Sequence, residues 1–201
     1  MEPSTPSRAR GYLVSLAATQ AIFFTLLAWC VAIDHSATAQ TDGISFYGVD
    51  HRTIVLLGLA FVVAAWGLWR AAAVFGALGA PALAVYGVRV VALGLFVVIA
   101  TPFNQGTFLN WTHMTAGVAV ALVQAAITIA LVRTAASAAS WSALVVQIAG
   151  GLLAAFSLPT WHFPYLLEGE VIYQVGFAAS LLIWMVVLVP TPRGIQAATI
   201  E

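Results

Sequence analysis

The stretch TIVLLGLAFVVAAWGLW, residues 53–69, decides the fold class of this chain. It contains no charged side chain, and Arg52 and Arg70 bound it on either side. About 17–25 apolar residues are enough for a helix to cross the hydrocarbon core of a bilayer. The stretch therefore predicts a membrane-spanning helix, and its flanking arginines mark the two membrane interfaces.

Five further apolar stretches of similar length occur in the chain, one before this stretch and four after it. The chain of 201 residues is 62% hydrophobic and 7% charged, whereas a soluble domain carries about 25% charged residues. The first apolar run is also longer than the roughly 7–15 residues of a signal-peptide core, so we expect it to be retained. We predict an all-α integral membrane protein, a six-transmembrane-helix bundle that forms a single domain over residues 1–201. The predicted helices are 12–33, 53–75, 85–101, 113–132, 140–158 and 170–189.

The basic residues predict the orientation of this bundle. All seven are arginine, and the absence of lysine is typical of a GC-rich bacterial genome. Six fall on one predicted side of the membrane: Arg8, Arg10, Arg70, Arg89, Arg133 and Arg193. Positive charge accumulates in cytoplasmic loops, so both termini are predicted to be cytoplasmic in a multi-pass protein of the cytoplasmic membrane.

Composition also argues against several functional classes. The formal net charge of zero does not fit a nucleic-acid partner, which requires a concentrated basic surface. Cys30 is the only cysteine, which excludes an internal disulfide and a Cys-x-x-Cys redox pair. No charge is expected deep in a helix, so an ion-coupled transporter is not predicted. Three glutamines are expected at depth and are assigned to helix-bridging hydrogen bonds: Gln20, Gln124 and Gln147.

The candidate functional residues gather on the predicted outer face. All four histidines and most of the acids fall there. The ligand-binding candidates are Ser45, Asp50, Asn104, Trp111 and Glu168. The metal-binding candidates are His51, His113 and His162, because neutral imidazole binds zinc, iron or haem and carboxylates can complete the shell. No His-x-x-x-His or His-Glu-x-x-His spacing fixes two of them on one helix, so interfacial hydrogen bonding stays the alternative and the cofactor stays unknown.

Two further arrangements on this face have alternative interpretations. Ser45 lies near Asp50 and His51 in sequence, but no Gly-x-Ser-x-Gly elbow marks a nucleophilic serine. Glu168 and Glu170 lie at the start of the last predicted helix, where carboxylates favour the positive end of the helix dipole. Neither arrangement by itself predicts catalysis.

Small residues predict where the helices approach closely. Runs at 149–154 and 116–121 are rich in glycine and alanine. In lipid, helices associate through such close backbone contact. We expect helix contacts at both runs, with a ligand groove as the alternative.

Three short motifs resemble a known family. They are Gly43-Ile44-Ser45-Phe46-Tyr47-Gly48 leading through Arg52 into a helix, Thr101-Pro102-Phe103-Asn104 followed by His113, and the segment from Glu168 to Gln174. They are similar to motifs of the bacterial six-helix family labelled domain of unknown function 998, and more distantly to DRAM/Sfk-type membrane proteins. The resemblance implies a six-helix bundle with its shared residues on the outer face. It implies no activity, although the eukaryotic relatives suggest roles in lipid organisation and membrane regulation.

Two functional hypotheses follow. The leading one is a non-enzymatic membrane protein that binds a membrane lipid, a membrane protein partner or a second copy of itself, through its outer loops and small-residue helix faces. The alternative is a metal-dependent enzyme acting on a lipid at the outer leaflet, with His51, His113 and His162 as ligands and Glu168 or Asp50 moving protons on a metal-bound water. Haem ligation by two of the outer histidines is a third hypothesis.

Overall fold

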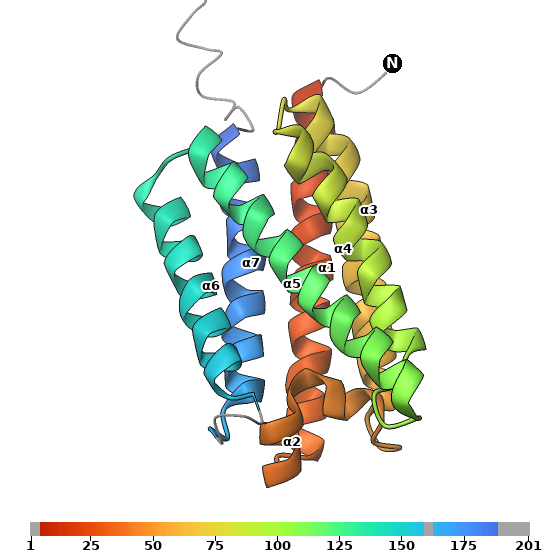
Figure 1. Cartoon of the computed structure of the whole chain (residues 1–201). Coiled ribbons are helices and arrows are strands. Elements are labelled where there is room, and N and C mark those ends of the chain that lie inside the picture. Colours follow the sequence, from red (N-terminus) through yellow and green to blue (C-terminus); the bar gives the residue numbers. More distant parts are fainter. Residues whose placement is uncertain (1–4, 159–162, 189–201) are drawn as a thin grey trace, which may run out of the picture.

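The protein is a bundle of long helices in a computed structural model, which describes residues 5–158 and 163–188 (Figure 1). Seven α-helices and one 3-10 helix occur in these ranges, and no strand does. The elements are α1 (Thr5–Ile33), α2 (Ala37–Asp42), η1 (Gly43–Gly48), α3 (Ile54–Ala77), α4 (Ala82–Ala100), α5 (Thr107–Thr134), α6 (Ala138–Phe156) and α7 (Leu166–Leu188). All except α2 and η1 are long and apolar enough to cross a membrane. The prediction of an all-α, six-helix, multi-pass membrane protein is confirmed.

The helix boundaries differ most from prediction at the starts of α1, α5 and α7, and α1 begins at Thr5, seven residues before its predicted start. α5 begins at Thr107, six residues before the predicted start, and α7 begins at Leu166 instead of 170. Hydropathy locates only the part of a helix that lies inside the hydrocarbon. The helical backbone hydrogen bonds continue beyond it into the interface. The N–H of Asn110 already donates to the Gly106 carbonyl at 3.0 Å, and Gly106 itself has a φ of +102°. This left-handed backbone, which favours glycine, sets the true start of α5.

The six spanning helices pack in a defined order. α1 packs against α3, α3 against α4 and α4 against α5, while α6 and α7 form a tight pair that contacts α5 (Figure 1). In the main core, Phe75 of α3 meets Trp184 of α7 edge to face, with ring centroids 5.0 Å apart. Polar side chains also connect helices at depth. Gln124 of α5 donates to Gln174 of α7 at 3.0 Å and accepts in return at 3.3 Å, as predicted for a helix-bridging glutamine.

Glycines bring α6 and α7 into backbone contact. A Cβ on Gly150 would lie 2.8 Å from the Gly169 carbonyl oxygen, and a Cβ on Gly169 would lie 2.7 Å from the Cα of Ala154. The predicted helix contact at 149–154 is therefore confirmed. In the run 116–121 the contact lies at Ala121, whose carbonyl accepts from the Tyr173 hydroxyl of α7, whereas a Cβ on Gly117 would meet nothing within 4 Å.

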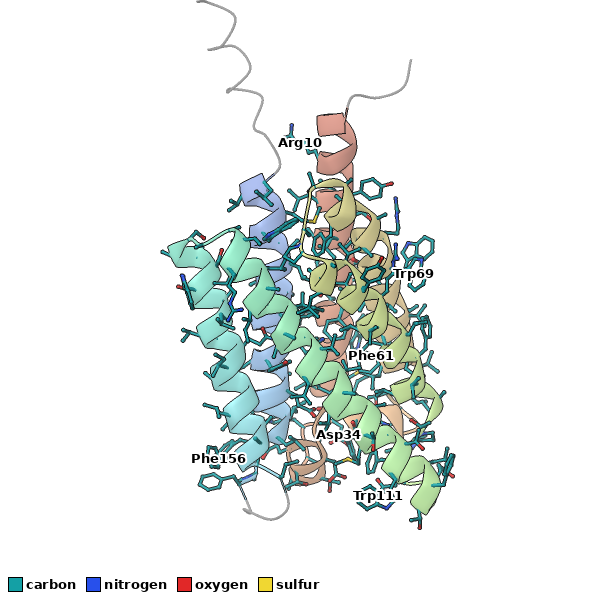
Figure 2. All side chains as sticks on the ribbon, turned by 45° about the horizontal axis from the view of Figure 1, so that its top comes forward. Arg10, Asp34, Phe61, Trp69, Trp111 and Phe156 are labelled. Carbon is teal, nitrogen blue, oxygen red and sulfur yellow. The ribbon has the colours of Figure 1, made fainter. Side chains whose placement is uncertain are left out.

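Charged residues separate to opposite ends of the bundle. Arg10 and Trp69 lie toward one end, whereas Asp34, Trp111 and Phe156 lie toward the other (Figure 2). We call the second one the η1 end; it holds α2, η1 and the first turns of α3, α5 and α7. The arginines at the first end lie over aromatic rings: Arg70 over Tyr12 and Trp66, and Arg89 over Trp69 and Tyr86. Which end faces the cytoplasm stays a prediction from the arginine distribution.

Candidate functional site

The site is built on η1, which lies between the first two predicted spanning helices, 12–33 and 53–75. Ser36 caps the short helix α2, with its Oγ accepting from the Ala39 N–H at 3.3 Å. Gly43, with a φ of +68°, then ends α2 and begins η1. A Cβ at Gly43 would overlap the carboxylate of Glu170, so both the backbone angle and the space favour glycine there. This turn places residues 44–48 across the η1 end.

Hydrogen bonds hold η1 to the helices around it. The Ile44 N–H donates to Glu170 Oε2 of α7 at 2.6 Å. The Tyr47 hydroxyl donates to the Asp34 carbonyl at 2.9 Å, and Thr53 Oγ1 donates to the Tyr47 carbonyl at 3.0 Å. Burial raises the pKa of Tyr47 to about 12, and the nearby Asp34 carboxylate adds to the effect, so the phenol remains a donor across the physiological range. η1 is thus anchored to the end of α1 and to the first turns of α3 and α7.

A serine of η1 and a histidine of α5 form a hydrogen bond with each other. Ser45 Oγ lies 2.7 Å from His113 Nε2, although 68 residues separate them in sequence. His113 Nδ1 lies 2.7 Å from the Thr101 carbonyl oxygen and 3.1 Å from that of Val98. A carbonyl oxygen can only accept, so Nδ1 carries the proton and neutral His113 offers the Nε2 lone pair to the Ser45 hydroxyl.

A small apolar cavity adjoins the Ser45–His113 pair. Its volume is about 80 Å³, several times the roughly 10–15 Å³ that one water needs. Ser45 and His113 line it together with apolar side chains of α3, α4 and the turn that follows α4. The main lining residues from these elements are Ile54, Leu57, Gly58, Val98, Ile99 and Pro102. A Cβ on Gly58 would meet nothing within 4 Å, as expected for a residue that faces open space.

The rim of the cavity lies on membrane-spanning helices. Ile54 of α3 is 46% exposed and Ile99 of α4 is 37% exposed, while His113 at the inner wall is only 6% exposed. Since α3 and α4 are adjacent spanning helices, these exposed apolar side chains border lipid. The cavity therefore joins a lipid-facing rim to a buried hydrogen-bonded pair.

Asp50 and His51 belong to a separate charged cluster. Arg52 contacts the carboxylate of Asp34 and lies 3.2 Å from Asp50 Oδ2 through its Nε. Hydrogen bonds from Ser36 and the adjacent Arg52 guanidinium hold the pKa of Asp34 below its usual value. His51 is 90% exposed in its side chain and lies 3.3 Å from Asp50 Oδ1. The sequence neighbours of Ser45 thus pair with one another, while Ser45 pairs with His113.

Three of the remaining candidates are described by the structure, and they lie apart from the cavity lining. Asn104 is exposed, and Trp111 is 68% exposed on a shallow groove between α4 and α5. Glu168 has one buried carboxylate oxygen, Oε2, with no hydrogen-bond partner among the described residues. His162 lies outside the described residues. Within those residues no group of three His, Cys, Asp or Glu side chains could hold a metal ion, so the metal-binding hypothesis stays a prediction.

Sequence reasoning missed two groups that shape the site. Glu170 was assigned to the helix dipole, yet it also anchors the Ile44 amide. The Thr101 carbonyl orients His113. A backbone acceptor at a helix end cannot be predicted from any pattern of side chains.

Comparison of the chain with family models, with curated proteins and with solved structures gives no match. The likeness to the six-helix family therefore stays a resemblance. Functional inference rests on the residues of the site.

Proposed function

We propose that this membrane protein binds a membrane lipid by inserting part of one acyl chain into the cavity between α3 and α4. The observation that carries the proposal is the combination described above: a lipid-exposed apolar rim, an apolar wall and a polar pair at the inner side. The arginine distribution predicts that this end lies in the outer leaflet.

The size and lining of the cavity favour a chain segment over a whole lipid. A volume of about 80 Å³ accepts only a few methylene or carbonyl groups. Each methylene transferred into an apolar wall contributes about 0.8 kcal/mol, but a chain already in hydrocarbon gains less. We therefore attribute selectivity to the polar pair, which can meet the ester region at the top of the chain.

The position of the cavity matches that region of a lipid. Ser45 lies in η1, and His113 lies in the second turn of α5, two residues after Trp111, which Figure 2 shows at the η1 end. Aromatic side chains gather at the headgroup level of a bilayer. An ester carbonyl at this depth would lie beside the polar pair, with its chain directed along Leu57 and Phe61.

Photo-crosslinking tests this proposal. The full chain would be reconstituted in vesicles of phosphatidylglycerol and phosphatidylethanolamine containing a phospholipid with a diazirine near the top of one acyl chain. Cross-links mapped by mass spectrometry are expected at Leu57 and Val98. Gly58→Leu fills the cavity, with no atom within 4 Å of its Cβ, and is expected to abolish this labelling because it occupies the space that the chain would enter.

Gly117→Leu is the matched control. A Cβ at Gly117 also meets nothing within 4 Å, but this glycine does not line the cavity. Labelling that is unchanged in Gly117→Leu and lost in Gly58→Leu supports the proposal. Labelling spread over the exposed helix faces and insensitive to Gly58→Leu would refute it.

A further inference from the structure

We propose that Ser45 is a nucleophile that takes an acyl group from a lipid ester, with His113 as its general base. This inference rests on the proposed lipid binding and goes beyond it, because it replaces the non-enzymatic interpretation of the sequence with an acyl-transfer activity.

The hydrogen-bond geometry assigns the roles of the two residues. The Ser45 Oγ to His113 Nε2 distance of 2.7 Å is within the range that proton transfer requires. The Thr101 carbonyl at 2.7 Å keeps the proton on Nδ1, so Nε2 is free to accept the serine proton. A nucleophile, a base and a third group that orients the base make up the arrangement by which serine is activated. Here a backbone carbonyl occupies the place that a carboxylate takes in the more familiar triad.

The surroundings of Ser45 favour reaction with a lipid. Ser45 and His113 are polar lining residues of a cavity whose other walls are largely apolar. An acyl ester can reach this cavity from the bilayer, past Ile54 and Ile99. The buried position of His113 keeps the base away from bulk water.

Ser45 is also held in place more firmly than an ordinary loop residue. The preceding residue, Ile44, is bonded to Glu170, and Tyr47 is bonded at both its hydroxyl and its carbonyl. A nucleophile reacts efficiently when its supporting groups fix its position. The anchors of η1 are therefore positioning groups for Ser45.

The reaction balances without a metal, an oxidant or a reductant. Ser45 Oγ forms a bond to the ester carbonyl carbon while its proton passes to His113 Nε2. The ester C–O bond then breaks, and the departing lipid oxygen takes that proton to leave as an alcohol. Acyl-Ser45 is released by the same steps in reverse, with water giving a free fatty acid or a lipid hydroxyl giving a new ester.

The same geometry would arise if Ser45 served only to anchor η1 to α5, so the test must detect nucleophilicity. The full chain in phospholipid vesicles would be treated with a long-chain alkyl fluorophosphonate, which captures activated serines with loss of fluoride. We expect one adduct, mapped to Ser45. Ser45→Ala and His113→Gln are expected to lose the adduct.

Controls separate this inference from lipid binding. Ser157 and Ser180 are buried serines whose hydroxyls donate to helix carbonyls, and we expect neither to be labelled. Ser45→Ala and His113→Gln should elute like the wild-type protein in size-exclusion chromatography in detergent, which shows that both variants are folded. Normal lipid cross-linking in the wild-type protein without an adduct at Ser45 would overturn the nucleophile and leave lipid binding intact. Loss of cavity cross-linking in the wild-type protein would overturn both.

Discussion

Removal of the Glu170 carboxylate should release η1 from α7. In the wild-type protein Glu170 Oε2 accepts from the Ile44 N–H at 2.6 Å, and Ile44 is buried. Glu170→Ala leaves that amide without its acceptor in a place that water enters poorly. An unsatisfied buried donor costs about 1–3 kcal/mol. A change of that size corresponds to about a 5–150-fold shift in an equilibrium constant.

Hydrogen exchange measures this shift directly. The rate of exchange of a protected amide reports the free energy of local opening. Mass spectrometry of the protein in lipid nanodiscs should therefore show exchange at residues 43–48 accelerated by that factor in Glu170→Ala. Glu170→Gln keeps an acceptor oxygen and should retain most of the protection. Peptides from α6 provide the internal reference, because the hydrogen bonds described above join η1 to other elements.

The opposite result would refute this account of the site. If residues 43–48 exchange at the same rate in Glu170→Ala as in the wild-type protein, Glu170 does not anchor η1. Ser45 would then have to be positioned by its other contacts, the bond to His113 and the bonds of Tyr47.

Two other predictions follow from the packing and from the charges. Gly150→Ala should lower the free energy of unfolding in detergent by about 1–3 kcal/mol, because its methyl would overlap the backbone of Tyr173. Gly117→Ala, which meets nothing within 4 Å, should be neutral or slightly stabilising, and equal stabilities for the two variants would contradict the backbone contact of α6 with α7. The pKa of Asp34 is lower in the folded protein than in the unfolded chain, where it is about 4. The ionised Asp34 carboxylate therefore stabilises the folded protein fully above about pH 4. This stabilisation is lost as the pH falls through the pKa that Asp34 has in the folded protein. The difference in melting temperature between wild type and Asp34→Asn should therefore shrink on acidification, and a difference that is constant from pH 6 to about pH 2 would count against this role for the pair with Arg52.

The residues of the site could be predicted from the sequence one by one, but their contacts with one another could not. Ser45 and His113 were both singled out by residue type and by the end of the bundle on which they fall, and the structure joins them. Their pairing could not be predicted, because 68 residues, including the whole of α3 and α4, separate them. Asp50 and His51 are nearer to Ser45 in sequence, but Asp50 pairs with Arg52 and with His51 instead.

What the sequence by itself determined is the number of spanning helices and the end of the bundle to which each charge belongs. The reason is local: in hydrocarbon every backbone N–H and C=O must be bonded within its own segment, so an apolar run of sufficient length becomes a helix wherever it packs. The tertiary structure alone decided which helices touch, through backbone contacts such as that of Gly150 with α7. It also decided that η1 lies across the bundle on Glu170 and that the Thr101 carbonyl faces His113, since both depend on close contacts between distant segments.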